Sequence, residues 1–239
     1  MVSKKIIIRK RREIISVMVA MFLFCGCLCG QYKSIIVPAG TKIIESFPPS
    51  ERYFYPQFME GKLVLNNGLS STGLINYNML LDDMEVIQDD NDTLTILKKR
   101  ELQYVIVEND TFIYMQGYAK HIYGQKLKIY CKDRIYLKEI LKKGAMGTVN
   151  RSAAIGSFSD FEDFGVPYQL VAPEDMVFKR EVSYHIATSR GTLESFKKKN
   201  ILKLFSSQKS EIKKYLKANK INFEKQEDVI EFAEFLSTL

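Results

Sequence analysis

The chain has 239 residues, of which 46% are apolar, and a formal net charge of +7 at pH 7. Residues 1–30 carry six of the 35 Lys/Arg but one of the 28 Asp/Glu, so the remainder has a net charge of only +2. This near-neutral remainder argues against a nucleic-acid-binding protein. Three of the four cysteines also lie within residues 1–30, which excludes an internal disulfide in the rest of the chain.

Residues 1–30 have the three parts of a bacterial export signal. Six basic side chains within residues 4–12 precede an apolar run over residues 14–28, and glycines and cysteines cluster at its end. This order is typical of a signal sequence, with its positive end on the cytoplasmic side. The pattern predicts an exported protein, either periplasmic or associated with the outer membrane.

Three fates remain open for this signal. The apolar run is shorter than the roughly 20 residues of a membrane-spanning helix, which favours cleavage by a general signal peptidase over a retained anchor. Gly26-Cys27 resembles the end of a lipoprotein signal and makes Cys27 the candidate lipidation site, although Phe24 stands where such signals usually have Leu. We expect the mature chain to begin between Cys27 and Gln31.

Residues 31–190 have the pattern of an antiparallel β domain. Short β-branched and aromatic runs alternate with Asn, Asp and Gly turns over residues 61–141. Asn67-Gly68 is the strongest hairpin signal among them. Further turns are predicted at residues 89–92, 109–110 and 132–133. Because no helical periods separate these runs, we expect an antiparallel meander rather than a parallel sheet.

The remaining chain predicts one loop and a group of helices. Residues 144–165 are rich in Gly, Ala and Ser and then acidic, which indicates a flexible loop. Residues 191–239 predict C-terminal helices, one of them capped by Ser207. The last helix is too apolar to stand alone, so we expect these helices to pack on the β domain. The predicted fold class is therefore α+β, mainly an antiparallel sheet with a small C-terminal helical segment.

No pattern of a catalytic, cofactor-binding or metal site emerges. His121 and His185, the only histidines, have no His or Cys at ligand spacing. The acidic run at 89–92 lacks the glycine of an EF-hand loop, and the carboxylates of residues 160–163 fall in the predicted loop. Cys131 lies in an alternating segment and is expected to be a small core residue. We predict no catalytic residue, no metal site and no cofactor.

Two parts of the chain resemble a family of uncharacterised exported bacterial cell-envelope proteins. The first combines residues 61–68, 74–78 and 84–87, and the second combines residues 201–205 and 212–223. The resemblance implies a β-meander followed by C-terminal helices. It implies no known activity and no functional residue.

These observations favour a non-enzymatic envelope protein that serves in interaction or structure. Its expected partner is another envelope protein or a membrane component, bound through a sheet face, an edge strand or the Lys-rich helices, and not a nucleic acid. Residues 192–239 hold ten lysines and seven acids, although such a charge run is also typical of a solvated helix face. The alternative is a small-molecule or lipid-binding protein with an apolar site between sheet and helices.

Overall fold

The computed structural model describes residues 34–87, 93–96, 98–143, 149–153 and 170–239. Contacts divide the chain into Met1–Tyr32 and a compact unit, Lys33–Leu239. The predicted export signal, with Cys27, lies outside the described residues, as does the predicted turn at 89–92. Within the described ranges, no helix is both long and apolar enough to cross a membrane.

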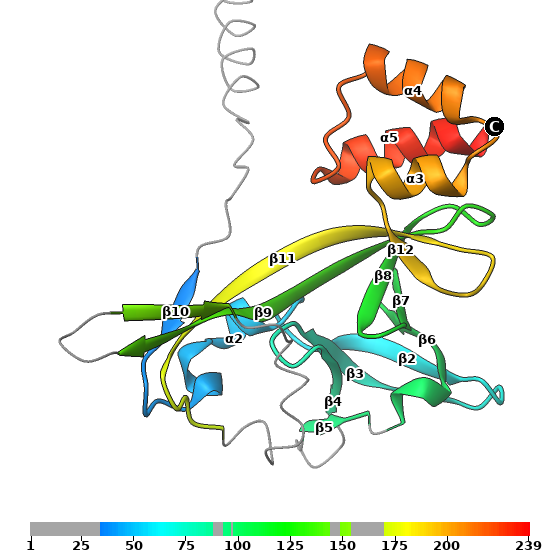
Figure 1. Cartoon of the computed structure of the whole chain (residues 1–239). Coiled ribbons are helices and arrows are strands. Elements are labelled where there is room, and N and C mark those ends of the chain that lie inside the picture. Colours follow the sequence, from blue (N-terminus) through cyan, green and yellow to red (C-terminus); the bar gives the residue numbers. More distant parts are fainter. Residues whose placement is uncertain (1–33, 88–92, 97, 144–148, 154–169) are drawn as a thin grey trace, which may run out of the picture. The chain divides into compact units, whose positions relative to one another are not determined.

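The described residues form one antiparallel sheet of twelve strands (Figure 1). The strands are β1 (Ile35–Val37), β2 (Met59–Leu65), β3 (Ser70–Asn78), β4 (Asp83–Ile87), β5 (Thr93–Thr95), β6 (Leu102–Val107), β7 (Asp110–Tyr114), β8 (Tyr118–Tyr123), β9 (Ile129–Lys143), β10 (Val149–Ala153), β11 (Asp175–Ala187) and β12 (Leu193–Ser195). Ten of them follow the order β1-β11-β9-β8-β7-β6-β2-β3-β4-β5, while β10 pairs with β9 and β12 with β11. Neighbours in sequence pair from β2 to β5 and from β6 to β9, which confirms the predicted antiparallel meander.

Short helices interrupt the strands, and three longer ones follow them. These elements are η1 (Ile43–Ser46), α2 (Pro49–Arg52), η2 (Lys99–Glu101), α3 (Lys198–Leu204), α4 (Lys209–Ala218) and α5 (Gln226–Ser237). The sheet with C-terminal helices confirms the α+β class. The predicted cap is wrong by one residue: Gln208 precedes α4, and the Ser207 hydroxyl donates to the Gln208 side chain instead of capping the helix.

The predicted hairpin at Asn67-Gly68 is confirmed between β2 and β3. Gly68 has φ +84°, a conformation that favours glycine. Its N–H donates to the Leu65 carbonyl at 2.9 Å, and the Asn67 side chain accepts the Leu69 N–H at 3.0 Å. Local side-chain chemistry therefore fixes this turn.

The predicted turn at residues 132–133 is wrong, because β9 runs straight through both residues. Lys132 Nζ donates to the carbonyls of Met115 and Gln116, at 2.8 Å each. The Asp133 carboxylate accepts two hydrogen bonds from Arg180 of β11. Partners on neighbouring elements satisfy these polar residues, so they need not form a turn.

The turn that does precede β9 follows Gly124. Gly124 has φ +77°, and a Cβ on it would lie 2.1 Å from the Leu127 carbonyl oxygen. The strand before it, β8, is absent from the sequence prediction.

The predicted loop at 144–165 is also wrong in part, because residues 149–153 form β10 against β9. The rest of that loop lies outside the described residues.

Two apolar cores lie along the β9–β11 pair. The first contains Leu137 and Phe178 together with residues from β1, η1, β3, β4, β6, β7 and β8. The second contains Cys131 and Tyr184 together with the inner faces of α3, α4 and α5. The described residues of both cores belong to the compact unit Lys33–Leu239.

The second core attaches the C-terminal helices to the strands. Phe232 of α5 is fully buried there, in edge-to-face contact with Phe196 and Phe223. Cys131 is buried at the same place, as predicted, and burial raises the pKa of its thiol to about 12. An inert thiol in an apolar core is the result.

Candidate functional site

The first polar cluster of the fold surrounds Glu85 on β4. Its side chain is fully buried, and it accepts hydrogen bonds from the Tyr53 hydroxyl at 2.6 Å and from Asn78 Nδ2 at 2.8 Å. The Asn78 side-chain oxygen accepts the backbone N–H groups of Leu80 and Leu81. Burial, followed by the Glu85 contact, raises the pKa of Tyr53 above its usual value. The neutral phenol therefore serves as a fixed donor to the carboxylate.

Asp82 joins two turns of the sheet. One of its oxygens, Oδ1, accepts the Tyr77 hydroxyl at 2.8 Å and the Tyr118 N–H at 3.0 Å. Gly117 approaches so closely that a Cβ on it would lie 2.3 Å from Asp82 Oδ2. Because Asp82 lies just before β4 and Gly117 just before β8, this contact holds the two segments together.

Asp83 is a buried carboxylate with one cationic partner. Its Oδ2 lies 3.0 Å from Lys99 Nζ, and the residue is only 6% exposed. Burial raises the pKa of Asp83 to about 6, and the Lys99 ammonium limits that rise. The folded state therefore binds a proton at Asp83 more readily than the unfolded chain does.

The stability of the Asp83→Asn variant should increase relative to that of the parent as the pH rises. Between the ordinary carboxyl pKa of 3.8 and about 6 the folded parent holds the extra proton, so its stability falls as pH rises through that window. From pH 4 to pH 7, the free energy of unfolding of the variant should rise by about 2–3 kcal/mol relative to that of the parent. Denaturant unfolding across this range checks it, with the exposed Glu60→Gln as control. A difference in free energy of unfolding that does not change with pH would contradict the raised pKa of Asp83.

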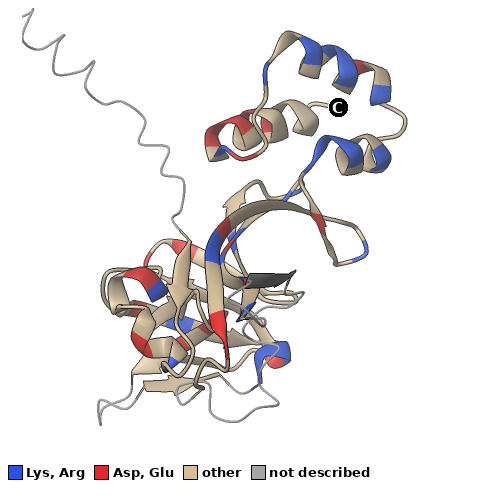
Figure 2. Cartoon of the chain, turned by 60° about the vertical axis from the view of Figure 1, so that its left-hand side comes forward, with Lys and Arg blue, Asp and Glu red and all other residues tan. Residues whose placement is uncertain are grey.

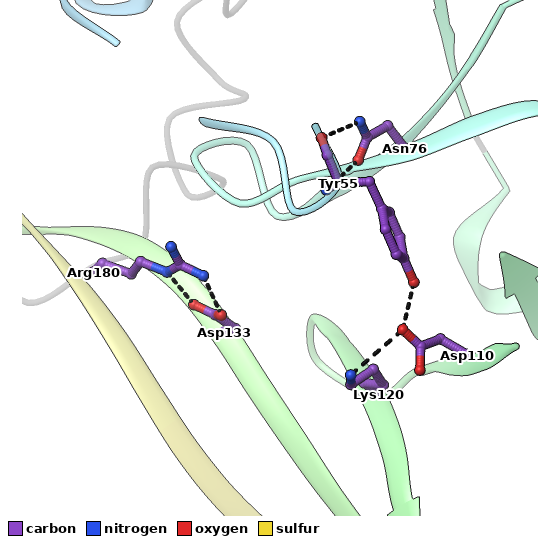
Figure 3. A network of polar contacts seen from close by, with 6 residues as sticks. All are labelled: Tyr55, Asn76, Asp110, Lys120, Asp133 and Arg180. Carbon is purple, nitrogen blue, oxygen red and sulfur yellow. Dashed lines mark hydrogen bonds and ion pairs between the residues drawn. The ribbon is translucent and has the colours of Figure 1, made fainter. Parts of the chain in front are cut away.

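Two further polar groups link segments that lie far apart in the sequence (Figure 3). The Tyr55 hydroxyl donates to Asp110 at 2.7 Å, and Lys120 Nζ contacts the same carboxylate at 3.4 Å. Asp133 receives both Arg180 Nε and Arg180 Nη2, at 2.7 and 2.6 Å. This second pair lies on β9 and β11, between the residues of the two apolar cores.

The two histidines lie in one row of the sheet. In the strand register His121 and His185 both oppose Tyr130, so they lie on the face opposite to Cys131 and Tyr184. Two strand spacings, about 9.5 Å, separate their backbones. His121 Nε2 donates to the Gly124 carbonyl at 2.7 Å, which gives this ring a structural role.

These polar clusters join segments of the fold. Each cluster pairs a carboxylate with a tyrosine, asparagine, lysine or arginine of the fold, and neither histidine hydrogen-bonds to a carboxylate within the part of the chain that the structure describes. In the same part, no group of three or more His, Cys, Asp or Glu could hold a metal ion. The predicted lipidation site Cys27 and the carboxylates of residues 160–163 lie outside it.

Sequence reasoning missed the polar cluster around β4. A sequence pattern could have predicted this cluster. Asn76 and Asn78 interrupt an apolar strand, and the acidic residues Asp82, Asp83 and Glu85 follow within a few positions. Buried polar residues in a strand need partners, so this density predicts an internal network. The identity of those partners, Tyr53 and Lys99, depends on the tertiary fold.

The exposed charge of the described chain is concentrated on the C-terminal helices. Residues 197–220 hold nine lysines and one acid, Glu211, while residues 221–239 hold one lysine and five acids. All nine lysines are exposed. Figure 2 shows the corresponding blue bands on α3 and α4 and the red start of α5.

Comparison of the chain with protein-family models, with curated proteins and with solved structures gives no match. Function is therefore inferred from the residues and geometry of this chain alone.

Proposed function

We propose that the chain is an exported, non-enzymatic interaction module of the cell envelope. The observation that supports the proposal is the basic segment followed by an apolar run at the start of the sequence. Six basic residues precede the apolar run of residues 14–28, and glycines and cysteines cluster at its end. This is the order that the export machinery recognises.

The use of polar side chains supports a non-enzymatic role. An active site needs a base or nucleophile whose reactive atom is free to meet a substrate. Glu85, Asp82 and Asp133 instead accept hydrogen bonds from buried or half-buried partners in the fold. The Cys131 thiol is buried and has a raised pKa. These side chains stabilise a scaffold and leave recognition to its surface.

The packing between strands and helices favours this proposal over a ligand-binding protein. Ile129, Phe232 and Leu236 meet there, each between 0% and 2% exposed, within one buried cluster. Close-packed apolar side chains fill the space that a small or lipidic ligand would need. The exposed surface is the part that remains available to a partner.

Protease accessibility in spheroplasts tests the export half of the proposal. The whole chain, with an epitope after Leu239, is produced in a bacterium with two membranes, and protease is added before lysis. We expect the epitope to be degraded without lysis. Val19→Asp with Leu23→Asp places two charges in the apolar run, where each is costly, and should leave the epitope protected until lysis.

The matched control adds the same two charges elsewhere. Ser206→Asp with Gln208→Asp changes the segment between α3 and α4, and the epitope should be degraded as in the parent. Protection of the parent epitope in intact spheroplasts would contradict export.

A further inference from the structure

The lysines of α4 share one side of the helix. At about 100° per residue, Lys209, Lys213, Lys217 and Lys214 fall within an arc of about 140°. The buried Ile212 and the half-buried Tyr215 lie outside that arc, and Ile212 belongs to the second core. The helix therefore buries one side and presents a continuous row of ammonium groups on another.

The same separation holds for α3. Ile201 is fully buried in the second core, whereas Lys198, Lys199 and Lys203 are exposed. Within the described ranges, none of the nine lysines of residues 197–220 forms an ion pair. An excess of positive charge over two consecutive helices attracts a surface of opposite charge.

The use of lysine rather than arginine favours a partner with negative charge spread over a surface. Residues 191–239 contain ten lysines and no arginine. Arginine is the residue suited to forked recognition of single phosphates, whereas lysine acts as a hydrated point charge. The aromatic side chains of the lysine-rich segment, Phe205 and Tyr215, are half-buried, and Tyr215 stacks on Phe235 at 4.0 Å. A single-stranded nucleic acid would need such rings free for stacking.

An apolar side chain accompanies the lysines. Leu204 is 41% exposed and follows Lys203 directly. A leucine among lysines suits the boundary between headgroups and acyl chains. Because Ile201 and Ile212 are buried in the second core, binding would be electrostatic and confined to the surface.

We propose that the lysine surface of α3 and α4, residues 197–220, docks on a membrane rich in anionic phospholipid. The inference rests on the proposed export for its biological setting, since an exported envelope protein meets such membranes. The charge pattern itself belongs to the folded unit Lys33–Leu239. Vesicle binding and export can therefore fail independently of each other.

Vesicle sedimentation of residues 31–239 tests the proposal. The vesicles contain roughly one phosphatidylglycerol for every two phosphatidylcholine molecules, or phosphatidylcholine alone. We expect binding to the anionic vesicles only, and loss of that binding at about 1 M salt, where the Debye length falls to about 3 Å. The variant Lys209→Gln, Lys213→Gln, Lys214→Gln, Lys217→Gln should bind roughly 1,000-fold more weakly.

A matched variant removes the same charge from the strands and turns. Lys62→Gln, Lys126→Gln, Lys142→Gln and Lys179→Gln change four exposed lysines outside the helices and should retain most of the binding. Circular dichroism and thermal unfolding check that both variants are folded. The α4 variant is expected to keep its helix because glutamine is a good helix former.

Three results would overturn the proposal. The first is equal binding to both vesicle types, and the second is an equal loss of binding in the two variants. The third is lysine-dependent binding to duplex DNA with none to anionic vesicles, which would identify a nucleic-acid surface instead.

Discussion

Phe232→Ala is expected to lower the free energy of unfolding by about 3–5 kcal/mol. Phe232 is fully buried, and its ring meets Phe196 and Phe223 edge-to-face at 5.8 Å each and stacks with Tyr215 at 5.7 Å. Removing the ring leaves a cavity at the centre of the second core, where strands and helices meet. Urea unfolding of residues 31–239, followed by circular dichroism, measures the change.

Phe235→Ala is the matched control for this prediction. Both phenylalanines belong to the apolar stripe of α5, but Phe235 is half-buried and stacks on Tyr215 at the edge of the core. We expect it to cost less than half as much as Phe232→Ala. Equal and small effects at both positions would contradict the docking of α5, as would an unchanged melting temperature after deletion of residues 224–239.

Arg180→Met is expected to cost about 3–5 kcal/mol of stability. The change leaves the Asp133 carboxylate, which is 10% exposed, without the guanidinium that donates two hydrogen bonds to it. A buried charge without its partner carries the full desolvation penalty. Arg180→Lys should fall between parent and Met variant, because lysine keeps the charge but not the forked geometry. Denaturant unfolding of the three proteins checks this order.

The double variant Asp133→Leu, Arg180→Met distinguishes a broken ion pair from lost packing. Removing both charges should recover most of the stability that Arg180→Met loses, since the buried carboxylate is gone. If the double variant is no more stable than Arg180→Met alone, the loss comes from the arginine's packing or from its other contacts. That result would contradict the role given to Asp133.

Local features of the fold could be predicted from the sequence because their causes are local. Asn67-Gly68 forms its hairpin through a glycine with positive φ and an asparagine that accepts a neighbouring N–H. The helices α3, α4 and α5 also follow from apolar spacing within each segment. The α+β class could be predicted from these two patterns together.

Features that depend on distant partners could not be predicted. Lys132 and Asp133 look like turn residues in sequence, but Arg180 lies 47 residues away from Asp133 and keeps it inside a strand. The same limit applies to the polar site at Glu85, whose donor Tyr53 comes from 32 residues earlier. The lysine surface could be predicted only in part. Its charge can be counted in the sequence, but its exposure depends on how the helices bury Ile201 and Ile212.

Intact-mass analysis of the native protein, recovered from the cell envelope, tests the central proposal of a processed export signal most directly. We expect a chain that begins between Cys27 and Gln31, because the small residues that precede a cleavage site cluster there. A lipid-modified N-terminal Cys27 would also agree with export, and would identify the lipoprotein route. A mass that still includes residues 1–12 would contradict the predicted processing.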